Sequence, residues 1–232
     1  MTAPPHESQG HHPFFASADT AADDPEVEAR AADRVVVFSD AVVAIAITLL
    51  ALDLPVPPST HTWTNAQFWH SLTSTGGEYF AFLLSFVIIG GNWAGHRRTF
   101  RYVNRLNHQV GYLNMLWLLM MILTPFAARL LALDGGFGVR FAIYTLVQVI
   151  ASACLLQTNR QIVSKELLRP DAPARARHPD SSHTIALIVV FLLSIPLAFV
   201  LGSWTFALWA AVPVLSQVLR RRRLAGGRHA TS

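Results

Sequence analysis

An ionisable residue lies inside a stretch that is otherwise apolar enough to enter a membrane. Residues 34–54 read RVVVFSDAVVAIAITLLALDL, with Asp40 in the first third and Ser39 beside it. A charged group inside a membrane helix costs roughly 2.5–3.5 kcal/mol on insertion scales, so it is usually kept for a partner or an ion pathway. Two roles are therefore open for Asp40: membership of a buried polar network that holds the helix in place, or direct binding of an ion or a proton.

The apolar residues that follow Asp40 repeat with helical spacing. At about 100° per residue, one seam of the helix contains Phe38, Ala41, Ile45, Thr48 and Leu52, with Leu49 at its edge. Asp40 lies about 140° away from Ile45 by the same arithmetic, so the carboxylate faces a different neighbour. The pattern predicts either a pore-lining helix with a stripe of large aliphatics and one hydroxyl, or a helix that packs through this stripe.

The composition indicates a membrane protein. Of the 232 residues, 52% are hydrophobic and 14% are charged, whereas a soluble domain carries about 25% charged residues. Six stretches approach the roughly 20 apolar residues that cross a bilayer, at about 35–54, 77–95, 109–133, 138–158, 183–201 and 203–219. We therefore expect an all-α membrane protein with six transmembrane helices over residues 30–220, a disordered tail over 1–29 and a basic tail over 221–232.

The positive charges predict the orientation. Sixteen of the eighteen lysines and arginines flank the spans on one side, and only Arg129 and Arg140 lie near the other. The positive-inside rule then places both termini and both tails in the cytoplasm of a multi-pass protein of the cell membrane. Because topology explains the basic residues, no nucleic-acid partner is expected.

Two other classes of protein were weighed. An enzyme would need clustered acids, bases or metal ligands, but His96 and His108 lack a paired carboxylate pattern and Cys154 is the only cysteine. We expect no enzymatic activity, no metal site and no cofactor. A secondary transporter of a cation or small solute would place charged or discontinuous-helix sites at the midplane, with internal repeats. The R-x-x-x-F-S-D string of residues 34–40 occurs once, which favours symmetry by oligomerisation.

That string carries a family resemblance. Arg34, Phe38, Ser39 and Asp40 are followed by Trp93 and His96 in a W-x-x-H pattern at the end of the second span, and by Asn114 with Leu116-Trp117 and Pro125-Phe126 in the third. Over about residues 30–220 the chain resembles the transmembrane protein 175 family of endosomal and lysosomal potassium channels, and in particular its prokaryotic members.

The resemblance implies a potassium-preferring channel built as a homotetramer in the lipid bilayer. The first helix of each subunit would line a central pore for monovalent cations, with a hydrophobic constriction at Ile45, Leu49 and Leu52 and the Thr48 hydroxyl beside it. Ser39 and Asp40 would bond within the subunit to Arg34, His96 and Asn114. Arg34 and Asp40 are about 240° apart on an ideal helix, so either the helix is broken near Phe38 or His96 and Asn114 mediate. For His96, a pH-sensing role and a purely interfacial one both remain open.

Overall fold

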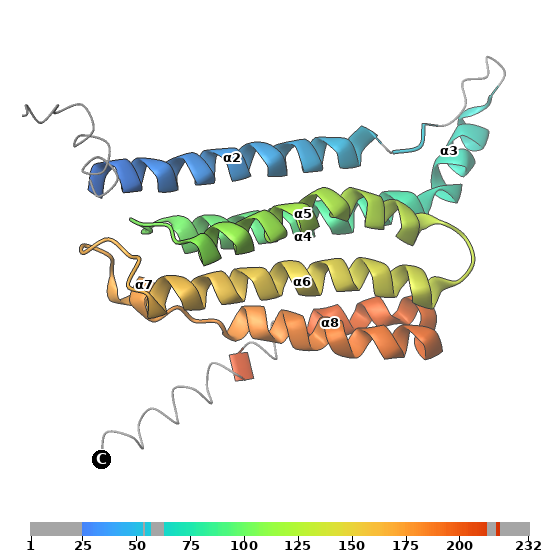
Figure 1. Cartoon of the computed structure of the whole chain (residues 1–232). Helices are drawn as coiled ribbons and strands as arrows, with labels where there is room; N and C mark the ends of the chain where they lie inside the picture. Colours follow the sequence, from blue (N-terminus) through green and yellow to red (C-terminus); the bar gives the residue numbers. More distant parts are fainter. Residues whose placement is uncertain (1–24, 53, 57–62, 213–216, 219–232) are drawn as a thin grey trace, which may run out of the picture.

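The computed structural model describes residues 25–52, 54–56, 63–212 and 217–218, and it is helical almost throughout (Figure 1). The elements are α2 (Pro25–Leu52), α3 (Asn65–Ser74), α4 (Gly76–Phe100), α5 (His108–Ala132), α6 (Phe137–Ser164), α7 (Ala174–Arg177), α8 (Ser182–Leu201) and the 3-10 helix η1 (Gly202–Ala211). The long helices run side by side along one direction, with α2 at one edge of the bundle and α8 towards the other. The expected all-α fold is confirmed.

The apolar spans are embedded in longer helices. α2 begins at Pro25, so residues 25–29 are helical, although the sequence predicted a disordered tail up to residue 29. Its first turns, EVEARAA, consist largely of strong helix formers that are too polar for a span. The rest of the predicted tail lies outside the described residues. α4 likewise continues past residue 95 to Phe100, because arginines in a last turn complement the helix dipole.

The last part of the chain forms a hairpin. α8 ends at Leu201, the φ of 56° at the following Gly202 is accessible to glycine, and η1 then returns along α8 (Figure 1). Five segments of the described chain are long and apolar enough to cross a membrane, and the fifth, Ala174–Trp209, contains both the predicted fifth span and the start of the sixth. Part of the predicted span 203–219 lies outside the described residues, so the count of six stays a prediction.

α5 and α6 form the centre of the bundle. Half of the most apolar window of each helix is buried, against 22% for α2 and for α4. Trp117 from α5 and Phe141 and Tyr144 from α6 are almost completely enclosed. η1 is held against this core by aromatic contacts, with the Trp209 ring 5.7 Å from Phe141 and 4.7 Å from Phe191.

The loops at the α7 end pair with one another. A β-bridge joins Val103 to Leu168, and the Arg169 amide donates to the Tyr102 carbonyl at 2.8 Å. Arg169 also reaches α2, with its guanidinium 3.7 Å from the Asp33 carboxylate. The α4–α5 connection and the segment between α6 and α7 therefore form one structure beside the start of α2.

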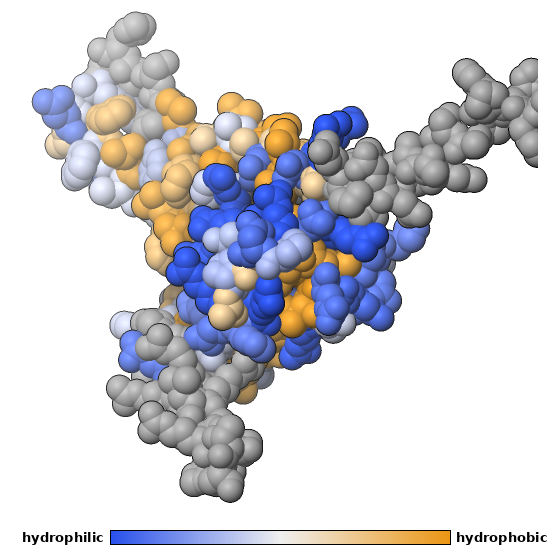
Figure 2. Space-filling view, turned by 90° about the vertical axis from the view of Figure 1, so that its left-hand side faces the viewer, coloured by the Kyte–Doolittle hydropathy of each residue, from blue (hydrophilic) through white to orange (hydrophobic). Residues whose placement is uncertain are grey.

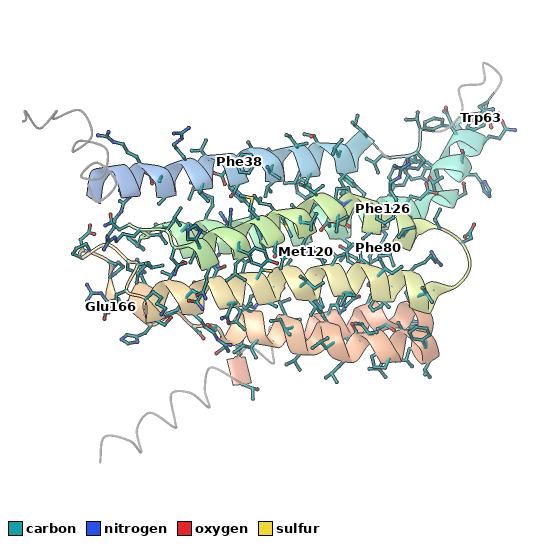
Figure 3. The ribbon with its side chains drawn as sticks, in the orientation of Figure 1. Phe38, Trp63, Phe80, Met120, Phe126 and Glu166 are labelled. Atoms are coloured by element: carbon teal, nitrogen blue, oxygen red, sulfur yellow. The ribbon has the colours of Figure 1, made fainter. Side chains whose placement is uncertain are left out.

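At the opposite end lies α3, in the linker between the first two predicted spans. Thr64 starts it with a capping box, in which its hydroxyl accepts from the Gln67 amide and the Gln67 side chain accepts from the Thr64 amide. Phe68 and Trp69 are exposed, and Trp63 lies beside them at this end of the molecule (Figure 3). Exposed aromatic rings next to polar residues are typical of the membrane–water interface.

Candidate pore-lining face and its polar anchor

The two sides of α2 have opposite environments. Val43, Ala46 and Leu50 are buried against the other helices, with at most 4% of their surface exposed. By contrast, 58% of Ile45 and 79% of Leu52 are exposed. Figure 3 shows side chains projecting from α2 on the side away from α4 and α5. The helix therefore presents one aliphatic face outward from the subunit.

The outward face contains the whole predicted seam. Its members Phe38, Ala41, Ile45, Thr48, Leu49 and Leu52 are all exposed in the single subunit. The Thr48 hydroxyl donates to the Ile45 carbonyl at 2.8 Å. Because its proton is used within the helix, the oxygen offers only lone pairs to a water molecule or a cation.

On its inward side, α2 contacts polar side chains of α4 and α5. We define the polar anchor as Ser39 and Asp40 of α2, Trp93 and His96 of α4, and Asn114 of α5. The Trp93 indole N–H donates to Asp40 Oδ1 at 2.8 Å, which connects α4 to α2. The Asn114 side-chain amide donates to Ser39 Oγ at 3.1 Å, and its Oδ1 lies 2.8 Å from His96 Nε2. Three helices, α2, α4 and α5, thus meet through these side chains.

The hydrogen bonds of His96 Nε2 and of the Ser39 hydroxyl each have a defined direction. An amide oxygen can only accept, so His96 donates through Nε2 to Asn114. The Ser39 hydroxyl in turn donates to the Val35 carbonyl at 2.8 Å. The His96 ring is stacked between Phe100 and Trp117, with both centroids 4.4 Å away. Only 1% of its surface is exposed, and the imidazole is accordingly held in one orientation.

Arg34 lies apart from the anchor. Its side chain is exposed, and the described hydrogen bonds of Ser39 and Asp40 go to other residues. α2 is unbroken from Pro25 to Leu52, so six residues of separation keep Arg34 and Asp40 on different sides of the helix. The helix is therefore not broken near Phe38. The hydrogen-bond partner of Asp40 in the described part of the chain is Trp93 rather than Arg34, His96 or Asn114.

The hydrogen bond between Trp93 and Asp40 was not predicted, although both residues belong to the motifs that carry the family resemblance. A signal was present, because a buried indole N–H usually finds an acceptor and Arg34, an expected partner of Asp40, is poorly placed for it on an ideal helix. No group of three or more His, Cys, Asp or Glu side chains suited to a metal ion occurs among the described residues.

Together, the long apolar helices and the buried polar anchor define a multi-pass, all-helical membrane protein. Residues 34–125, which include the whole anchor, match the sequence model of the family described as endosomal/lysosomal potassium channel TMEM175. The resemblance to the transmembrane protein 175 family is thereby confirmed over these residues.

Characterised relatives agree with this assignment. The chain is 38% identical over 120 residues to a potassium channel of Streptomyces collinus, covering 50% of this chain and 57% of that protein. It is 42% identical over 99 residues to a potassium channel of Chamaesiphon minutus, covering 43% and 48%. The matches thus span about half the length of these relatives. The fold extends further: the crystal structure of a lysosomal potassium-selective channel TMEM175 homolog from Chamaesiphon minutus matches with a TM-score of 0.65 and 25% identity, covering 83% of this chain and 98% of that one.

Proposed function

We propose that this protein is a potassium-preferring cation channel whose pore is lined by α2. The observation that carries the proposal is the division of α2 into two faces: Ser39 and Asp40 bond to other helices of the subunit, while Ile45, Leu49 and Leu52 on the other face are exposed. Potassium is proposed as the permeant ion because relatives of this chain are named potassium channels. The channel acts without a cofactor, and its partners are the lipid bilayer, monovalent cations and further copies of the chain.

In the proposed assembly, four subunits surround a central pore. Their Ile45, Leu49 and Leu52 side chains form aliphatic rings, which account for the exposure of these residues in the single subunit. An aliphatic ring gates by dewetting, since an ion must shed water there and gains no ligands. Potassium loses its hydration shell at a lower cost than sodium, so a narrow apolar ring favours potassium. Thr48 places an oxygen within the same stretch of pore.

The polar anchor has a structural role in this mechanism. The width of an aliphatic ring depends on the rotation and position of each α2. Trp93 and Asn114 donate hydrogen bonds to the adjacent residues Asp40 and Ser39 of α2. These bonds fix the rotation and the axial position of α2, because they attach the helix to α4 and α5 at one point along its length. Selectivity at Ile45 therefore depends on residues that never touch the ion.

The proposed topology has six spans in a channel domain over residues 30–220, with both termini and the tails 1–29 and 221–232 in the cytoplasm. It is supported by the gathering of basic residues at the α7 end of the bundle, at Arg98, Arg101, Lys165 and Arg175. This end is the cytoplasmic one by the positive-inside rule.

Reversal potentials across planar bilayers, with potassium opposite sodium, test the proposed function. The unmodified protein should reverse near the potassium potential. Ile45→Ala should raise the conductance and move the reversal potential towards zero, because it removes three carbons from each subunit's side of the ring. Leu83→Ala is the matched control, since Leu83 is 59% exposed but lies on α4.

An unchanged ion preference in Ile45→Ala would contradict the assignment of the constriction. Absence of current together with saturable, concentrative uptake would favour the secondary transporter instead. The subunit number is tested separately by native mass spectrometry, which should show a mass four times that of the 25.5 kDa chain.

A further inference from the structure

A second site lies outside the proposed pore. An open cavity of about 760 Å³ is lined by α4, α6, α8 and the connections at the α7 end, and no residue of α2 lines it. Its walls change character along the helix axis. Val87 and Arg98, both on α4, line it eleven residues apart, which corresponds to about 16 Å along a helix. The cavity therefore runs from the end of the bundle well into the apolar part of the helices.

The end at α7 is basic. Arg98 and Arg101 from the end of α4 and Arg175 from α7 line it, together with one carboxylate, that of Asp180. The Asp180 Oδ1 accepts from the Ser182 amide at 3.0 Å at the start of α8. All three arginines are exposed, and hydrophilic residues cover this end of the molecule (Figure 2). The entrance thus has an excess of positive charge and can be reached from water.

The inner end is apolar. Val87 and Ile88 on α4 face Leu187 and Phe191 on α8 across the cavity. Amide side chains line the zone between the two ends, at Asn92 and Asn159, while the hydroxyls of Thr99 and Thr184 lie nearer the arginines. The cationic side chains are therefore confined to the α7 end, where apolar Ile162 and Leu168 also line the cavity, and the inner end is aliphatic.

We propose that this cavity binds an anionic phospholipid. The order of the lining matches the order of groups in such a molecule: a phosphate at the arginines, the glycerol esters at the amides and hydroxyls, and an acyl chain along the aliphatic zone. Guanidinium groups bind phosphate oxygens with paired hydrogen bonds. Basic pockets between transmembrane helices on the cytoplasmic side are suited to acidic headgroups. A free phosphate would use the entrance alone and leave the aliphatic zone hydrated, which the hydrophobic effect opposes.

Native mass spectrometry of the full-length protein tests the site, using defined phosphatidylglycerol or phosphatidylcholine added to delipidated protein. We expect phosphatidylglycerol to be retained preferentially. Arg98→Gln/Arg101→Gln should weaken that retention roughly tenfold or more, since each basic residue near an acidic headgroup contributes appreciably. The matched control is Arg160→Gln/Lys165→Gln, which removes two exposed charges near the same end of α6 that do not line the cavity.

A second variant probes the acyl zone without changing charge. Gly91 lines the cavity, and a Cβ atom there would meet no atom within 4 Å. Gly91→Leu should fold, because leucine favours a helix more than glycine does, and should weaken phosphatidylglycerol retention while leaving binding of glycerol 3-phosphate unchanged. Equal losses in the two charge pairs, or equal retention of the two lipids, would overturn the proposal. Glycerol 3-phosphate binding as tightly as the lipid would identify a free phosphate ligand instead. These outcomes do not depend on whether the protein conducts ions.

Discussion

Asn114 is the residue that connects the three helices around the polar anchor. A carboxamide contains both a donor and an acceptor, and Asn114 uses the first on Ser39 and the second on His96. Only 2% of its surface is exposed, so water cannot replace either partner. A side chain of similar size that lacks either the donor or the acceptor would leave a buried polar group without a hydrogen-bond partner.

Replacing Asn114 with leucine should therefore destabilise the protein by about 1–3 kcal/mol, because the His96 N–H loses its acceptor and the Ser39–Asn114 bond is lost. The thermal unfolding midpoint of the detergent-solubilised protein measures the effect. Gln157→Leu makes the same chemical change at an exposed position of α6 and should leave the midpoint near that of the unmodified protein. Equal midpoints for the two variants would show that the anchor contributes nothing to stability.

At the scale of the element, the helix α2 is apolar on both faces, since Val43 and Leu50 are buried while Ile45 and Leu52 are exposed. In a soluble protein the apolar stripe of a helix faces the core and the polar residues face water, whereas α2 buries Ser39 and exposes Ile45 and Leu52. Such a helix needs an environment outside the subunit that accepts aliphatic side chains. Lipid and an aliphatic pore both satisfy this condition, but only a pore makes part of the face accessible to water.

Cysteine accessibility distinguishes these environments. In a Cys154→Ser background, Ala41→Cys lies on the seam one turn before the proposed constriction. We expect a water-soluble methanethiosulfonate reagent to modify it and to reduce the current. Leu83→Cys, exposed on α4, should react only with membrane-permeant reagents. If the two cysteines react alike with the water-soluble reagent or both resist it, α2 does not line an aqueous path.

At the scale of the whole molecule, charge is unequally divided between the two ends of the bundle. Basic residues gather at the α7 end, where hydrophilic side chains cover the surface (Figure 2). Two arginines, Arg129 and Arg140, lie near the other end instead, and the position of Arg140 has a local explanation. The Arg140 guanidinium donates to the carbonyls of Leu131, at 2.8 Å, and of Gly135, and so satisfies the end of α5.

This asymmetry predicts which end faces the cytoplasm. In a Cys154→Ser background, an impermeant maleimide applied to intact cells should label Asp134→Cys, in the exposed α5–α6 turn, and should leave Lys165→Cys unlabelled until the cells are permeabilised. Both positions are exposed in the structure, so a difference in labelling reports the side of the membrane. The reverse pattern would invert the proposed topology.

The sequence by itself determined the helices, the apolar spans and the two faces of α2. These properties depend on residues close together in the chain: hydrophobic run length decides a span, and a repeat of three and four residues decides which side chains share a face. The positions of Ile45 and Thr48 on one side of α2 and of Asp40 on another follow from helical geometry alone. The helix ends were less predictable, since α2 and α4 extend into polar residues that a hydropathy pattern does not include.

Only the tertiary structure decided which residues meet. The Trp93–Asp40 bond joins residues 53 positions apart, and the Asn114–Ser39 bond joins residues 75 positions apart. The basic cavity gathers side chains from α4, α6, α7 and α8. Such pairings depend on how each helix is rotated and at what height it packs against its neighbours. Those quantities are set by the summed contacts of whole helices, and no local repeat in the sequence encodes them.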